Sequence, residues 1–172
     1  MTKTRTVGFV SGDNKDLTPK VFYGFKAGLR YARPYCELLK GLSATYTDKA
    51  REKELTDRMF ECDADMIFII SGKTDTGTIR LMDGSETVIT SVIKNFDEII
   101  DELVEQYRED ELAFGKNVVY GLEKNRIDLD ESMRDIVAEE TYNQLSDLKE
   151  QIMDRELIVP QNEEEYLAFT DN

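Results

Sequence analysis

The chain has 172 residues, of which 40% are apolar and 34% are charged, and its formal net charge is −14. This composition is typical of one soluble globular domain and excludes a disordered chain. The acidic surface disfavours nucleic acid and anionic lipid as partners, because both carry negative charge.

Histidine is absent, and the two cysteines are Cys36 and Cys62. The missing histidine excludes serine-type and cysteine-type catalytic triads and the commonest zinc sites, and two cysteines are too few for a disulfide scaffold. Any enzyme would then have to use carboxylates, lysine or tyrosine. Because no complete catalytic motif is present either, we expect a protein that is not an enzyme and has no cofactor and no metal. No apolar run reaches the ~20 residues of a membrane span, and the first residues show no signal-peptide pattern. If the sequence is complete, we expect a cytoplasmic protein.

In the first half of the chain, apolar runs of strand length alternate with helical patterns. The strands are expected at 6–10, 38–46 and 65–70, and the helices at 18–33 and, after the N-cap Asp48, up to Cys62. This alternation predicts an α/β fold with a mostly parallel sheet and helices on both faces.

The second half departs from that alternation. An Asp83-Gly84 turn between two apolar runs predicts a β-hairpin at 78–91. Further along, we expect a strand at 118–122 and a last helix whose apolar face runs from Met133 to Ile152. The predicted domain organisation is one lobe over residues 1–160, followed by an acidic flexible tail at 161–172.

The strongest helical pattern of the chain follows the predicted hairpin, with Asn95 or Asp97 as its N-cap. Its apolar residues fall on one stripe at helical spacing, namely Phe96, Ile99, Ile100, Leu103, Val104 and Tyr107. We expect this helix to be strongly amphipathic.

Two motifs overlap after the third predicted strand. Gly72-Lys73-Thr74 has the ending of a nucleotide-binding P-loop, but the glycine required five positions earlier is Ile67. Asp75 to Thr78 spell the tetrad of aspartic proteases, which needs an all-β fold and a second aspartate from another lobe or subunit. What remains is a glycine-containing turn at the carboxyl end of a buried strand, where open α/β sheets bind ligands.

Several segments together resemble the second lobe of the basic membrane protein family, the purine-nucleoside-receptor-like solute-binding proteins of ABC transporters. The segments are collinear, and they are Val7–Gly12, Phe22–Gly28, Asp48–Leu55, Cys62–Phe68, Ile69–Gly77, Thr90–Lys94, Tyr120–Leu122 and Leu148–Pro160. The resemblance implies a lobe of the periplasmic-binding-protein-like (type I) fold and a small solute, such as a nucleoside, held between two lobes.

The resemblance also implies candidate ligand-binding residues. Lys94 is similar to the lysine that contacts the ligand, and Gly72, Lys73, Thr74 and Gly77 belong to a segment similar to the loop that approaches the ligand with its backbone. The family often has an aromatic residue at the position of Val21, and Phe22 stands next to it.

The chain differs from that family in two respects. The first lobe is absent, and Thr78 to Glu86 replace a helix and a strand whose end carries an aspartate suited to a ribose. We therefore expect an isolated chain to bind nucleosides near millimolar strength or not at all. Two functions stay open. One is a solute-binding module that works with a separate first-lobe or transporter partner or as a homo-oligomer. The other is a cytoplasmic regulatory or protein-interaction domain that no longer binds nucleoside.

Overall fold

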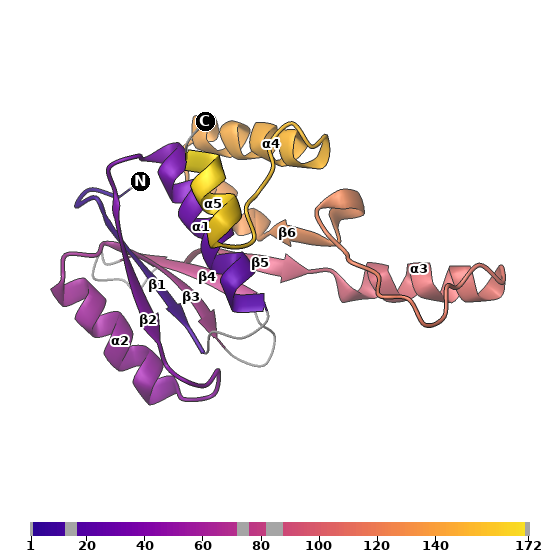
Figure 1. Ribbon diagram of the computed structural model, residues 1–172, viewed down its shortest axis with the longest axis horizontal. Coiled ribbons are helices and arrows are strands. Elements are labelled where there is room, and N and C mark those ends of the chain that lie inside the picture. Colours follow the sequence, from indigo (N-terminus) through magenta and orange to yellow (C-terminus); the bar gives the residue numbers. More distant parts are fainter. Residues whose placement is uncertain (1, 13–16, 72–75, 82–87, 171–172) are drawn as a thin grey trace.

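The computed structural model describes residues 2–12, 17–71, 76–81 and 88–170. These residues contain a six-stranded sheet with the order β2-β1-β3-β4-β5-β6 (Figure 1). The strands are β1 (Thr6–Ser11), β2 (Glu37–Leu42), β3 (Met66–Ser71), β4 (Thr76–Leu81), β5 (Val88–Lys94) and β6 (Ile127–Leu129). The helices are α1 (Leu17–Ala32), α2 (Lys49–Glu61), α3 (Phe96–Arg108), α4 (Glu139–Met153) and α5 (Glu163–Thr170), with 3₁₀ turns at Glu123–Asn125 and Glu131–Asp135.

Four of the six strands point in the same direction. Strand β1 is parallel to β2 and β3, whereas β4 is antiparallel to both β3 and β5. Strand β5 therefore runs in the direction of β3, and β6 is antiparallel to β5. The predicted α/β lobe is confirmed, with parallel pairing in the β2-β1-β3 part of the sheet and antiparallel pairing from β3 to β6. The hairpin predicted at 78–91 is β4 with β5.

Side chains of β1 and β3 alternate between two covered faces of the sheet. Phe9, Phe68 and Ile70 pack toward α1, and Val10, Ile67 and Ile69 pack toward α2. Figure 1 shows α2 on one side of the sheet and α1, α4 and α5 on the other. Because both faces are covered, these strands are continuously apolar.

Helix α2 packs unusually close to the sheet through Met59. A Cβ atom at Gly8 would lie 2.7 Å from the Met59 sulfur, and one at Gly41 would lie 2.9 Å from its methyl carbon. Larger residues at these two strand positions would push the helix away from the sheet. The glycines of β1 and β2 therefore set how closely α2 can pack.

Two strand predictions were wrong. The second strand ends at Leu42 instead of 46, because the chain turns at Ser43, whose amide donates to the Ser11 carbonyl. Residues 118–122, all of them described, form no strand and lie exposed or half-buried beyond the sheet. A strand needs a partner edge, and the open edge of β5 is taken by β6 instead.

The chain after residue 130 also differs from the prediction. The predicted last helix is interrupted, with Met133 buried in a 3₁₀ turn and α4 beginning only at Glu139. Residues 163–170 form helix α5 instead of a flexible tail. This helix packs on α1, where the Tyr166 ring lies 6.1 Å from that of Tyr23 and 4.1 Å from the Lys26 ammonium.

Candidate functional site

The carboxyl ends of β1, β2, β3 and β5 lie along one edge of the sheet, because these four strands share a direction. This is the edge at which open α/β sheets bind ligands. We call it the carboxyl edge. At about 4.8 Å per strand, the ends of β1 and β5 are roughly 14 Å apart, with β3 and β4 between them.

A hydroxyl-rich corner is built where β1 and β2 end. The Ser43 amide donates to the Ser11 carbonyl at 2.9 Å, and the Thr18 and Tyr46 hydroxyls are hydrogen-bonded at 2.7 Å. The Tyr46 ring lies directly against Gly12, where a Cβ atom would approach it to 2.4 Å. Only glycine fits there, so Tyr46 covers the backbone at the exit of β1.

Phe22 lies in the core cluster beneath this corner. Its ring makes an edge contact with Phe9, with centroids 5.1 Å apart, and the Lys40 ammonium lies 4.1 Å from its centroid. Burial lowers the pKa of Lys40, and the charge of Lys26 lowers it further. Phe22 is thus half-buried, with a cation on its ring, and its role in ligand binding stays a prediction.

Lys94 is the last residue of β5 and lies at the carboxyl edge, half-buried. In the sheet it pairs with Ile127 of β6, and the next amide, that of Asn95, donates to the Arg126 carbonyl at 3.0 Å. The backbone that carries Lys94 is therefore held by β6 and by Arg126, the residue that precedes β6. An ammonium group at this edge can donate hydrogen bonds to hydroxyl or carbonyl oxygens of a solute.

The other predicted residues follow β3. Gly72, Lys73 and Thr74 lie outside the described residues. Gly77 belongs to β4 and pairs with Ile70 of β3, so it lies within a strand and not in the loop predicted at 71–77. The resemblance implied a loop at Gly77, and glycine is rare inside strands, so nothing local in the sequence opposed it. Because β4 runs opposite to β3, its first residues lie at the carboxyl edge, and Gly77 is the second residue of β4.

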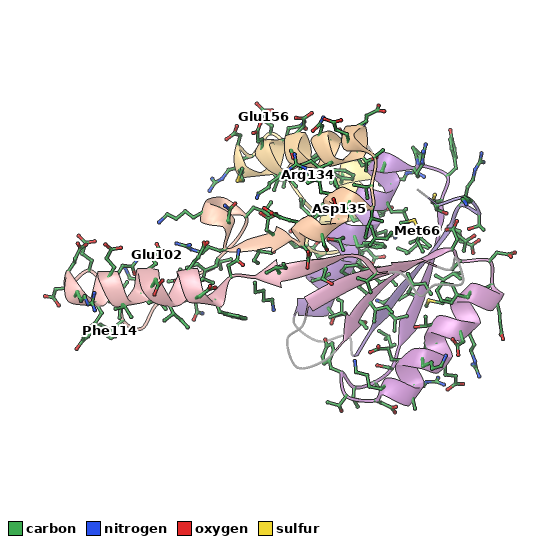
Figure 2. The ribbon with its side chains drawn as sticks, turned by 180° about the vertical axis from the view of Figure 1, so that it is seen from behind. Met66, Glu102, Phe114, Arg134, Asp135 and Glu156 are labelled. Atoms are coloured by element: carbon green, nitrogen blue, oxygen red, sulfur yellow. The ribbon has the colours of Figure 1, made fainter. Side chains whose placement is uncertain are left out.

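An ion-pair network lies just beyond Lys94, where α3 leaves the sheet. Arg126, which is 9% exposed, contacts Glu98 at 3.0 Å and also Glu102, and Lys124 contacts Glu102 at 2.9 Å. Hydrogen bonds from Lys124 and then Arg126 lower the pKa of the Glu102 carboxyl, and the bond to Glu102 raises the pKa of Arg126. Figure 2 labels Glu102 on this helix. The network fixes the direction in which α3 projects.

Sequence reasoning missed Thr18, Ser43 and Tyr46 as members of the corner. Tyr46 was assigned to a strand, although it follows Ser43, whose hydroxyl donates to the Thr45 carbonyl in a local turn. A serine followed by threonines is a signal for such a turn, and it would have moved Tyr46 to the edge.

In the described part of the chain, no helix is both long and apolar enough to cross a membrane. The same residues bring together no group of three or more carboxylate or thiol side chains that could hold a metal ion.

With this geometry in place, comparisons with known proteins identify the family. The family model of ABC transporter substrate-binding proteins, PnrA-like, matches residues 1–82 and 80–163. The chain belongs to this family. The match is made in two stretches that meet at β4, which is where the sequence suggested that a helix and a strand are missing.

Individual relatives are similar to nearly the whole of this chain. Basic membrane protein B of Borreliella afzelii is 25% identical over 95% of this chain and 52% of its own length. The CD4+ T-cell-stimulating antigen of Listeria innocua is 22% identical over 93% of this chain and 54% of its own length. The chain thus spans about half the length of these relatives, as expected for one lobe.

A solved structure supports the fold. An ABC transporter solute-binding protein from Conexibacter woesei superimposes with a TM-score of 0.71 at 17% identity, over 92% of this chain and 58% of that protein. At this identity the likeness establishes the shared fold alone.

Proposed function

We propose that the chain is a non-catalytic solute-binding lobe, residues 1–160, that contacts a nucleoside-like ligand through its carboxyl edge. The observation that carries this proposal is the position of Lys94 at the same edge as the hydroxyl corner of Thr18, Ser43 and Tyr46. Membership of a family of ABC transporter substrate-binding proteins supports a small solute as the ligand, and the sequence resemblance described above motivates the choice of a nucleoside.

Lys94 and the hydroxyl corner offer complementary chemistry, a charged donor and neutral hydroxyls, but they are separated by roughly 14 Å along the carboxyl edge. A solute between them would lie over the end of β3 and the start of β4, and Gly72, Lys73 and Thr74 follow β3 in the sequence. Lys94 would donate to hydroxyl or carbonyl oxygens, and hydroxyl groups would donate or accept at the other side. A small solute therefore contacts one of the two groups directly and is enclosed only when a second surface covers it.

A single edge gives weak binding. If a closed two-lobe site binds with a micromolar dissociation constant, its binding free energy is about −8 kcal/mol. Half of those contacts would then give a dissociation constant of about 1 mM. NMR titration of the ¹⁵N-labelled chain with adenosine, guanosine and inosine suits this range. We expect saturable shifts for the amides around Ser11, Ser43 and Lys94, with a millimolar dissociation constant.

Lys94→Met tests the site directly, because it keeps the length of the side chain and removes the charge. We expect the nucleoside shifts to weaken by at least about tenfold, since a hydrogen bond to a charged group contributes about 1.5–3 kcal/mol. Lys53→Met on α2 is the matched control, because Lys53 pairs with Asp57 on the exposed side of that helix, away from the carboxyl edge. Equal titration curves for the Lys94→Met and unchanged proteins would contradict the proposal.

A further inference from the structure

Helix α3 and the segment behind it project away from the sheet, at one end of the molecule (Figure 1). None of the thirteen residues of α3, all of which are described, is buried. Phe96 is 57%, Ile100 56% and Tyr107 67% exposed, and Val119 in the returning segment is 92% exposed. We call residues 96–122 the arm. An exposed apolar surface of this kind marks an interaction site in a soluble protein.

The ion-pair network explains why the apolar stripe faces outward. At 100° per residue, Glu98 and Glu102 lie on the side of α3 opposite to Phe96, Ile100 and Tyr107. Arg126 and Lys124 bind the two glutamates and hold that side against the chain. The apolar stripe is therefore turned toward solvent in a fixed orientation, which is how a docking helix is preorganised.

A groove of matching character lies between α1 and α4. It has a volume of about 740 Å³, and its floor and walls include Phe25, Leu29, Met66, Phe68, Leu145 and Leu148. Five of these six side chains are only half-buried, and Phe68 is the buried one. The α4 wall has fifteen residues and α3 has thirteen, which correspond to about 22 and 20 Å of helix. The arm and the groove thus agree in length and in apolar character.

The charges of the two surfaces are opposite at one end of the groove, while the groove lining itself carries one arginine, Arg33, and one aspartate, Asp147. Residues 96–111 carry eight carboxylates against one arginine. The groove opens into a second depression that shares Thr2 and Arg33 with it, and the described residues that line this depression include Lys3, Arg5 and Arg33 but no carboxylate. Asp147 is on the α4 side of the groove. An acidic amphipathic helix fits an apolar groove with a basic end, because opposite charges steer and orient the contact.

The arm cannot reach the groove of its own chain. Figure 2 shows Glu102 and Phe114 of the arm at one end of the molecule and Met66, which lines the groove, toward the other. We propose that the occupant of the groove is the α3 arm of a second copy of this chain. Two copies lying antiparallel exchange arms twice, so the contact closes into a dimer.

Sedimentation velocity of the full chain, from micromolar to millimolar concentration and at low and high salt, measures this association. We expect a species of twice the 19.8 kDa chain mass that forms with rising concentration and weakens with salt. Ile100→Glu places a carboxylate in the docked stripe and should weaken association by roughly 30-fold or more. Ile158→Glu is the matched control, because Ile158 is 76% exposed and lies in neither surface, and we expect it to leave association unchanged.

Leu148→Glu in the groove should weaken association as strongly as Ile100→Glu. Arg33→Glu also changes the groove, but at an exposed position where the substitution does not disturb the apolar packing. If circular dichroism shows that the Leu148→Glu variant is unfolded, Arg33→Glu takes its place. Mixing an arm variant with a groove variant leaves one intact arm and one intact groove, so the mixture should associate again through a single contact.

A chain that stays monomeric at millimolar concentration would overturn the proposal. So would groove variants that dimerise like the unchanged protein, because arms would then pack on arms, and so would a mixture that fails to associate. No ligand is added and Lys94 is untouched, so these results are independent of the proposed solute binding.

Discussion

Helices α2 and α3 have equal length, thirteen residues each, yet α2 packs into the core and α3 does not. The apolar positions are fewer in α2, where Met59 and Leu55 provide the contact with the sheet. Helix α3 has six large apolar residues on one stripe, and none of them is buried. The two helices differ in whether the sheet lies below them. Two glycines in β1 and β2 let α2 approach, whereas α3 begins beyond the end of β5 and has no sheet below it.

This difference predicts that an apolar-to-alanine substitution has a large effect on stability in α2 and a small one in α3. Met59→Ala removes a buried side chain that fills the space above Gly8 and Gly41, and we expect the free energy of unfolding to fall by about 2–5 kcal/mol. Ile100→Ala removes a side chain that is 56% exposed, and we expect a change below about 1 kcal/mol in dilute, monomeric protein. Urea unfolding of both variants measures this. Similar losses in both would mean that α3 packs on the chain in solution.

The contrast also shows what could be predicted from the sequence. The pattern of 65–70 and the Asp83-Gly84 turn were sufficient for β3 and for the hairpin of β4 and β5, because burial on two faces and turn chemistry are local signals. The amphipathic pattern of residues 96–107 was sufficient to predict the helix α3. It could not predict whether the apolar face is buried, because burial depends on a neighbouring surface. The strand predicted at 118–122 was wrong for the same reason, since propensity does not supply a partner strand.

For the candidate site, the resemblance singled out Lys94, and the structure has this residue at the end of β5. Sequence reasoning missed the corner of Thr18 and Tyr46, because the two hydroxyls are 28 residues apart and meet only after β1 and β2 pair. The loop that the resemblance implied at Gly77 is a strand instead, and the sequence pattern alone could not correct it, because a short strand that returns beside β3 has no distinctive pattern.

The two helix starts give a smaller and more local test. The Asp48 carboxylate accepts a hydrogen bond from the Arg51 amide at 2.9 Å and caps α2, whereas the N-cap residue of α3, Asn95, makes no such side-chain bond. We expect Asp48→Ala to lower the unfolding free energy by about 1 kcal/mol and Asp48→Asn to retain most of it, because asparagine keeps the acceptor. Thermal or urea unfolding is precise enough for this comparison. Equal losses in the two variants would show that charge, and not the capping bond, is responsible.

The smallest effect concerns the ion pairs that orient α3. The folded state lowers the pKa of Glu102 below its ordinary value of 4.5, first through Lys124 and then through Arg126. A carboxyl with a lowered pKa stabilises the folded arrangement above its unfolded pKa, and this contribution is lost as pH falls through the folded pKa. The orientation of α3 should therefore be constant from neutral pH to about pH 5 and loosen in more acidic solution.

A ¹³C NMR titration of the Glu102 carboxyl measures this directly. We expect a midpoint below 4.5 in the unchanged protein, and a return toward 4.5 when Lys124→Gln and Arg126→Gln are combined. Arg126→Gln alone should return it only in part, because the Lys124 bond at 2.9 Å remains. A midpoint at or above 4.5 in the unchanged protein would mean that the network does not form in solution. The apolar stripe of α3 would then have no fixed direction, and the preorganised docking helix would lose its structural basis.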